Sequence, residues 1–277
     1  MSTGANTNDF KTIYLEEVIA KKSPKLAKRI PAFIYSYLKK VLHITELNYF
    51  FGKHGGDKGV KFTQHVLEYL NITYEIKGKE NLPKDGRNIF ASNHPLGGAD
   101  GIMLINCLGK KYDLQFPVND ILLNVKSLND IFLAVNKHGS QAKEAALKLN
   151  EAFDSDKQIA IFPAGLVSRK HKGGHIKDLE WKKTFISKAI SSKRDIIPVH
   201  ISGKNTNFFY NLANIRKFLG VKANIEMLYL VDEFTKHRGK HFTITFGKAI
   251  PHTELAKNHS QKAWAEKIKN IVHSLNK

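Results

Sequence analysis

Hydrophobic residues recur with two different spacings along the chain, and the spacing changes near residue 70. Before that point, apolar side chains return every three or four residues, which is typical of amphipathic helices. The spacing predicts basic helices within residues 21–51 and another helix over residues 62–70, with a glycine-rich loop between them at residues 52–59. Residues 1–11 are polar and predict a disordered tail.

Beyond residue 70, short apolar segments alternate with helical ones. Strands are predicted at residues 72–76, 88–92, 114–118, 158–162, 196–201 and around 242–246. Helices are predicted at residues 100–108, 140–153 (capped by Ser140), 180–191, 207–218 and 257–275. This alternation favours an α/β fold with a mixed central sheet flanked by helices. We expect two parts, a basic helical segment over residues 1–70 and an α/β domain over residues 71–277.

The charge balance narrows the set of partners. The 277 residues include 44 Lys and Arg against 25 Asp and Glu, a net charge of +19. Such a charge suits nucleic acid, an anionic membrane surface, or an acidic protein or substrate. Between residues 21 and 61, ten basic residues are opposed only by Glu46 and Asp57. These helices could lie on an anionic leaflet with their apolar stripe in the headgroup region. Alternatively, the stripe packs on the α/β core and the lysines are solvated.

Cysteine content and hydropathy indicate the compartment. The single cysteine, Cys107, excludes an internal disulfide and a cysteine-rich zinc site, and it favours a reducing compartment, most simply the cytoplasm. The N-terminal residues lack the apolar segment of a signal peptide. No stretch approaches the roughly 18 apolar residues that a membrane-spanning helix needs. We therefore expect a cytoplasmic protein that does not cross a membrane by itself.

The first candidate for chemistry follows the predicted strand at residues 88–92. His94 lies just beyond the strand, where open α/β sheets place their ligands, and an imidazole can accept a proton near neutral pH. Asp100 could orient that ring, and Gly97 and Gly98 permit the tight turn that brings the two together. The alternative is an exposed loop histidine beside an aspartate that only caps a helix.

The second candidate follows the strand at residues 158–162. Gly165 turns the chain, and Ser168, Arg169 and Lys170 come next. Nine basic residues between positions 165 and 194 are opposed only by two acids, so this stretch suits an anion-binding rim. A solvated basic loop explains the same residues equally well.

Other motifs lack the context that their chemistry needs. His171 and His175 have the spacing of a helical zinc pair, but Gly173 and Gly174 make a helix unfavourable between them. Residues 52–59 lack the Gly-Lys-Ser/Thr ending of a phosphate loop, and no preceding strand is predicted. Cys107 lies among apolar residues, which is typical of a core position. No metal site is predicted.

Three sequence motifs, in a fixed order along the chain, resemble those of a known family. They are Asn93-His94 with Asp100, then residues 162–165 with Ser168-Arg169, then residues 197–199. The chain resembles the PlsC-like lysophospholipid acyltransferases, which carry N-H-x4-D and F-P-E-G-T-R-S blocks and a late V-P-V strand. The resemblance spans residues 72–201. Residues 93–101 and 165–181 look most like a bacterial branch often labelled haemolysin, which includes O-acyltransferases that make ornithine and glycine lipids.

The resemblance implies a reaction and roles for residues. An acyl group would pass from acyl-carrier protein or coenzyme A directly to the hydroxyl of a lysolipid, with no cofactor, metal or covalent intermediate. His94 would be the general base and Asp100 its partner. Backbone N–H groups near Gly97–Gly98 or Gly165 would stabilise the oxyanion. The protein would act at the cytoplasmic face of the inner membrane. The residues expected to bind donor or acceptor are Asn93, Gly97, Gly98, Gly165, Ser168, Arg169 and Lys170.

Two departures from the family pattern bear on geometry and acceptor. Five residues separate His94 from Asp100 instead of four, so the loop must bulge. Ala164 replaces the family's Glu, and Leu166-Val167 replace the Thr-Arg pair of a block that serves a phosphate-bearing acceptor. An apolar pair cannot hold a phosphate dianion, although Arg169 could partly substitute. We expect an acceptor without glycerol phosphate, such as a lyso-aminolipid.

Three alternatives stay open from the sequence. The chain could be a 1-acylglycerol-3-phosphate acyltransferase, or a family member that only binds lipid. A basic nucleic-acid-binding protein would explain the net charge, but no helix-turn-helix or RNA-recognition signature is present, so nucleic acid is not an expected partner.

Overall fold

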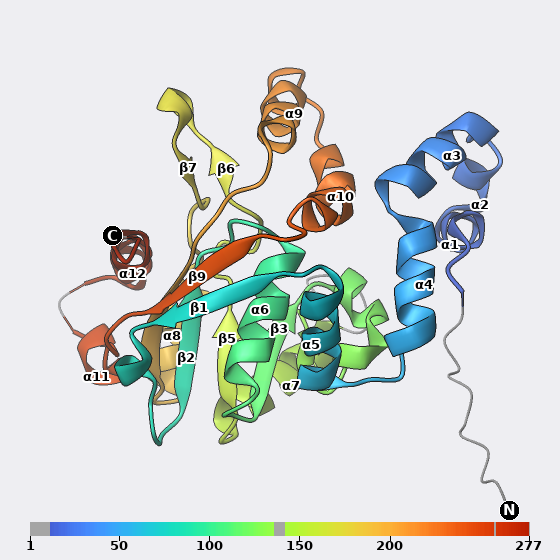
Figure 1. The fold of residues 1–277 in the computed structure, drawn as a ribbon. Helices are drawn as coiled ribbons and strands as arrows, with labels where there is room; N and C mark the ends of the chain where they lie inside the picture. The colour runs from blue at the N-terminus through green and yellow to red at the C-terminus, as the bar shows by residue number, and fades with distance from the viewer. Residues whose placement is uncertain (1–11, 136–141, 258, 277) are drawn as a thin grey trace, which may run out of the picture.

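The computed structural model describes residues 12–135, 142–257 and 259–276 (Figure 1). A seven-stranded sheet forms its centre, in the order β1-β9-β8-β2-β5-β3-β4. Neighbouring strands are parallel except for the antiparallel pair β8–β9, which confirms the predicted α/β fold with a mixed sheet. The strands are β1 (Thr73–Lys77), β2 (Asn88–Ser92), β3 (Leu114–Val118), β4 (Phe132–Ala134), β5 (Gln158–Ile161), β8 (Asp195–Ile201) and β9 (His241–Phe246).

Helices cover both faces of the sheet. One layer contains α4 (Ile44–His54), α5 (Gly59–Tyr69) and α6 (Gly98–Leu108). The opposite layer contains α7 (Ala142–Asp154), α8 (Thr184–Ser191), α11 (His252–Leu255) and α12 (Gln261–Ser274). Side chains of β2 alternate between the two cores, Phe90 to the first and Ile89 and Ala91 to the second. Strand β2 is buried on both faces, and in residues 93–100 beyond its carboxyl end only His94 and Gly98 are not buried.

The other elements lie beyond the sheet (Figure 1). An antiparallel pair, β6 (Arg169–Lys170) with β7 (Ile176–Lys177), extends to the same side as α9 (Asn207–Phe218) and α10 (Leu230–Thr235). Helices α1 (Leu15–Lys22), α2 (Pro24–Ala27) and α3 (Ala32–Val41) precede α4. Short 3-10 helices complete the structure: η1 (Lys79–Asn81), η2 (Asp120–Asn124), η3 (Lys126–Leu128), η4 (Lys172–Gly174) and η5 (Ile225–Tyr229).

Differences from the predicted elements have local causes. The helix predicted from residue 180 begins only at Thr184, because the Lys182 N–H donates to the Pro163 carbonyl and holds the preceding residues extended. The loop predicted at residues 52–59 is shorter, since α4 continues to His54. Strands β4, β6 and β7 have two or three residues, too few to show an alternating pattern. Ser140 and residues 1–11 lie outside the described residues.

The apolar stripe of residues 21–51 has two environments. In α4, Phe50 is buried in the core beside β-sheet residues, and Phe51 packs against it. In α3 no residue is buried, and Phe33 is 70% exposed. Part of the segment therefore packs on the sheet while α3 keeps its apolar side chains at the surface. The division of the chain at residue 70 stays a prediction. Within the described ranges, no helix is both long enough and apolar enough to cross a bilayer.

Candidate active site

The loop after β2 holds the His94 imidazole on two sides. Its Nδ1 is 2.8 Å from Oδ2 of Asp100, and its ring stacks on Phe162 with centroids 3.9 Å apart and an 11° angle between planes. Phe162 follows β5, the parallel neighbour of β2, so the two strand ends meet as the sequence predicts. The His94 side chain is 16% exposed. One edge and one face of the ring are therefore held by the protein.

Asp100 lies fully buried in the first turn of α6. Its Oδ2 accepts hydrogen bonds from the backbone N–H groups of Leu96 (2.8 Å) and Gly97 (3.0 Å) as well as from His94. Burial raises the pKa of Asp100, and these hydrogen bonds oppose the rise. Three donors converging on one oxygen suit a carboxylate. With Asp100 ionised, His94 donates through Nδ1, and Nε2 keeps the lone pair that can accept a proton.

Gly97 absorbs the extra residue between His94 and Asp100. Its φ is +85°, a conformation that side-chain-bearing residues rarely adopt, and it caps α6 by accepting the Asp100 N–H (3.2 Å). A Cβ at this position would also lie 3.2 Å from the Leu230 side chain of α10. The bulge therefore preserves the His94–Asp100 hydrogen bond despite the five-residue spacing.

Comparison with known proteins identifies the family. The sequence model of the acyltransferase family matches residues 17–276. The chain belongs to this family. It is 48% identical over 265 residues, covering 95% of this chain and 97% of the relative, to a Bacteroides thetaiotaomicron protein named lyso-glycine lipid O-acyltransferase. A Phocaeicola vulgatus protein of the same name is 47% identical, covering 95% of both chains. The crystal structure of PlsC, a 1-acyl-sn-glycerophosphate acyltransferase from Thermotoga maritima, is 17% identical, covering 87% of this chain and 95% of that one, with a TM-score of 0.49.

Two of the predicted binding residues of this acyltransferase hold the backbone around His94. The Asn93 amide donates to the Ile201 carbonyl (2.9 Å) and accepts from the Ile201 N–H (2.7 Å), which joins the ends of β2 and β8. Ser168 donates its N–H to the His94 carbonyl (2.8 Å). Both side chains are buried. In this structure they position the loop that carries His94, and contact with donor or acceptor stays a prediction.

Asp178 completes this framework and was missed by the sequence analysis. Its Oδ1 accepts hydrogen bonds from the His94 N–H (3.2 Å) and the Ser168 hydroxyl, and its Oδ2 accepts from the Trp181 indole (2.8 Å). The carboxylate is 1% exposed. The available signal was one of two acids among nine cations, but the sequence alone did not place it next to the His94 backbone.

We expect Asp178→Asn to lower kcat of the acyltransferase by about 10-fold. An amide offers one acceptor oxygen in place of two, so at least one of the three donors loses its partner, and His94 shifts from its position. Steady-state kinetics of the purified variant measures the effect. Asp85→Asn, at an exposed position, is the matched control. Full kcat in Asp178→Asn would show that this framework does not position His94.

The Arg169 side chain forms an ion pair inside the acyltransferase. Its guanidinium is 3.0 Å from Glu226 of η5, which also pairs with Arg216 at 2.8 Å. Glu226 is fully buried, and burial lowers the pKa of Arg169 while Glu226 opposes that change. One carboxylate is thus shared by two guanidinium groups, and Arg169 lies in a buried ion-pair cluster, not on an open cationic rim, while its contact with donor or acceptor stays a prediction. Sequence reasoning could not foresee a partner 57 positions away.

The turn at Gly165 brings a different cation to the strand end. Gly165 has φ +67°, a conformation that side-chain-bearing residues rarely adopt, and a Cβ there would lie 2.8 Å from Nζ of Lys182. Its N–H donates to the Phe162 carbonyl (2.9 Å). Lys170 is half-buried on β6. The exposed side chain of Lys182, which the sequence placed in a helix, therefore lies at this turn.

Proposed function

We propose that this acyltransferase transfers a fatty acyl group from a thioester donor to the hydroxyl of a lyso-glycine lipid. The observation that carries the proposal is the near-full-length similarity to two proteins named for that reaction. The His94–Asp100 pair supplies the chemistry that such a transfer needs. The acceptor and donor are argued below from the residues around this pair.

The proposed mechanism is a direct transfer. Nε2 of His94 takes the proton of the acceptor hydroxyl as its oxygen attacks the thioester carbonyl, and Asp100 stabilises the resulting imidazolium. The tetrahedral intermediate then expels the thiolate, which recovers the proton from His94. The new ester bond forms as the thioester bond breaks. The dyad returns to its initial protonation state without a covalent enzyme intermediate.

A backbone N–H can stabilise the oxyanion only if it does not already donate a hydrogen bond within the protein. The Gly97 N–H is donated to Asp100, and the Gly165 N–H to Phe162. Gly98 opens α6, where first-turn N–H groups have no acceptor within the helix. We assign the oxyanion donor to the Gly98 N–H, which the positive end of the helix dipole strengthens.

The surroundings of β5 favour an acceptor without a phosphate monoester. Ala164 and Val167 are buried, and Val167 packs with Phe209 and Tyr210 of α9. Arg169 already donates to the Val167 carbonyl and to Glu226. Its guanidinium is therefore not free to bind a phosphate dianion in the bidentate geometry that best holds one. A glycine head group presents a carboxylate, whose single charge needs less compensation.

The test is acyl transfer to a panel of acceptors. Acyl-carrier protein thioester and acyl-coenzyme A are each supplied with lyso-glycine lipid, lyso-ornithine lipid or lysophosphatidic acid, and His94→Ala is assayed beside the wild type. We expect kcat/KM for lyso-glycine lipid to exceed that for lysophosphatidic acid by at least about 100-fold, because an uncompensated phosphate charge costs several kcal/mol. A preference for lysophosphatidic acid would overturn the acceptor assignment and leave the dyad intact.

We also propose that an apolar surface beside the catalytic loop contacts an anionic membrane. On α9 and its C-terminal cap, Phe208, Ile215 and Leu219 recur at helical spacing and are 49%, 56% and 66% exposed. The Tyr229 ring lies against Phe208, and its hydroxyl is 2.5 Å from that of Tyr37 on α3. Tyr229 therefore connects Phe208 of α9 with Tyr37 of α3, whose side chains are both exposed. With a net charge of +19, this surface suits an anionic bilayer better than a neutral one.

Vesicle binding tests this surface. We expect the double variant Ile215→Glu/Leu219→Glu to bind anionic vesicles at least about 10-fold more weakly, because two apolar contacts are lost and two like charges face the lipid. Leu147→Glu, which changes a 53% exposed leucine on α7, is the matched control and should bind normally. Co-sedimentation with phosphatidylglycerol vesicles measures both. Equal binding of the double variant and the control would exclude α9 from the membrane contact.

A further inference from the structure

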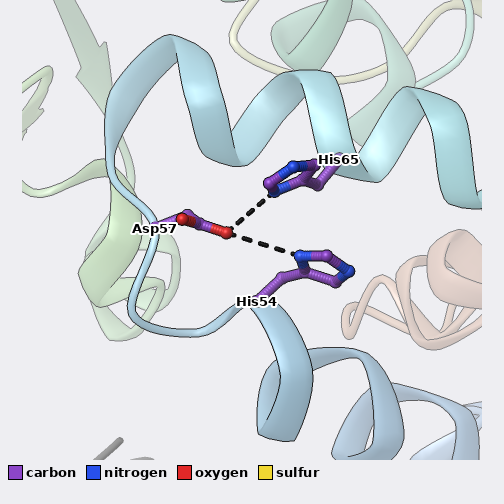
Figure 2. Close-up of side chains that lie close together, drawn as sticks. All are labelled: His54, Asp57 and His65. Atoms are coloured by element: carbon purple, nitrogen blue, oxygen red, sulfur yellow. Dashed lines mark hydrogen bonds and ion pairs between the residues drawn. The ribbon is translucent and has the colours of Figure 1, made fainter. Parts of the chain in front are cut away.

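Three potential metal ligands lie together where α4 meets α5. His54 ends α4, Asp57 lies in the linker at residues 55–58, and His65 is on α5. Figure 2 shows both imidazoles turned toward the Asp57 carboxylate. The adjoining residue Val60 lies against Gly109, at the C-terminal end of α6, whereas Asp100 is in the first turn of that helix. The cluster is therefore separated from the catalytic dyad by the length of α6, about 15 Å.

The spacing of the donor atoms fits a shared ion. His65 Nδ1 is 2.8 Å and His54 Nδ1 is 3.4 Å from the same oxygen, Oδ2 of Asp57. The ligand atoms of the three residues all lie within 4.8 Å of one another. In a tetrahedral zinc site with bonds of about 2.0–2.2 Å, donor atoms are about 3.3–3.6 Å apart. Small side-chain rotations are enough to reach this arrangement.

Packing holds the rings in place while leaving access from solvent. The two imidazole centroids are 4.2 Å apart, and the His54 ring also lies 5.1 Å from that of Phe50, which is buried in the core. The His54 and Asp57 side chains are 18% and 17% exposed, and His65 is 25% exposed. A largely preorganised set of ligands costs little entropy on binding. The residual exposure leaves room for water as a fourth ligand.

Lys61 is the group that competes with a cation for Asp57. Its Nζ lies 2.8 Å from Oδ1 of Asp57, one helical turn away, and its side chain is 70% exposed. The ammonium can therefore move into solvent when a dication arrives. Each neutral imidazole then offers its Nδ1 lone pair and carries its proton on Nε2, so binding to the neutral rings needs no net proton release.

We propose that His54, Asp57 and His65 bind one Zn²⁺ and that the ion fastens α4 to α5. Two imidazole nitrogens and one carboxylate oxygen form a donor set that suits Zn²⁺ better than Mg²⁺ or Ca²⁺, which prefer oxygen ligands alone. Helix α4 continues the N-terminal helices that carry Phe33, and α5 packs on α6. The ion therefore links the basic N-terminal segment to the body that holds the catalytic loop.

The test measures zinc binding to the full-length protein by calorimetry and metal analysis after dialysis. We expect one Zn²⁺ per wild-type chain and a higher Tm with zinc, because a ligand that binds only the folded state stabilises it. His65→Ala should weaken binding by at least about 100-fold. The control is the double variant His171→Ala/His175→Ala, which removes two exposed histidines and should bind as the wild type does.

Lys61→Met keeps all three ligands and removes the competing charge. We expect it to bind Zn²⁺ about 10-fold more tightly than the wild type, since the Asp57 carboxylate is no longer shared. This variant preserves the test if His65→Ala fails to fold. Stoichiometric zinc that survives in His65→Ala, or no zinc bound by either the wild type or Lys61→Met, would overturn the proposal. Zinc lost equally from the His171/His175 control would also overturn it.

Discussion

Replacing His94 with alanine is expected to lower kcat for acyl transfer by about 1,000-fold. The acceptor hydroxyl then loses the base that removes its proton, and a positioned base contributes roughly 100- to 10,000-fold. The ring makes one side-chain hydrogen bond, to Asp100, and one stacking contact, with Phe162. Its removal should therefore affect chemistry far more than folding. Steady-state kinetics with acyl-carrier protein thioester and lyso-glycine lipid measures the loss.

The control for His94→Ala separates chemistry from structure. His171→Ala removes an exposed histidine on the neighbouring β6–β7 connection and should keep the wild-type kcat. Circular dichroism and Tm of His94→Ala should show a folded protein. Turnover within 10-fold of wild type in folded His94→Ala would contradict the direct-transfer mechanism, because that mechanism has no second base at this loop.

Asp100→Asn is expected to lower kcat by at least about 100-fold while KM changes little. An amide cannot stabilise the imidazolium as a carboxylate does. Its oxygen can still accept the N–H groups of Leu96 and Gly97, which now bind Oδ2, so the loop keeps its shape. The split between kcat and KM therefore distinguishes a positioning role from simple loss of structure.

The double variant His94→Ala/Asp100→Asn sharpens this prediction. If Asp100 acts through His94, the double variant should be no slower than His94→Ala alone, because residues that act as a unit are not additive. A further 100-fold loss in the double variant would show that Asp100 acts on the substrate or the fold independently of His94. The comparison uses the same assay and acceptor as the single variants.

The sequence was sufficient to place the two strand ends that meet at the site. Strands β2 and β5 are short apolar runs followed by His94 and by the turn at Gly165, and parallel strands put their carboxyl ends at one edge of a sheet. The glycines at 97 and 98 predicted the bulge that restores the 2.8 Å hydrogen bond to Asp100. These inferences succeed because they depend on local periodicity and backbone freedom.

Contacts between segments far apart in the chain could not be predicted from the sequence. Asn93 and Ile201 are 108 positions apart, and their paired hydrogen bonds link the ends of two strands. Arg169 finds Glu226, and Asp178 reaches the backbone of His94, only through the folding of β6, η5 and the residues before α8. The partner of a charged or hydrogen-bonding side chain depends on tertiary geometry. The type of that residue and its neighbours in the sequence do not encode this geometry.

The sequence by itself determined the fold class and the family, and it predicted that His94 and Asp100 meet, because strand periodicity, turn glycines and ordered motifs are local properties of the chain. The tertiary structure alone decided which charged groups lie together. It paired Arg169 with Glu226, brought Lys182 to the turn at Gly165, and joined His54, Asp57 and His65 across the junction of two helices. A side chain's chemistry depends on the groups within a few ångströms of it, and long-range packing selects those groups.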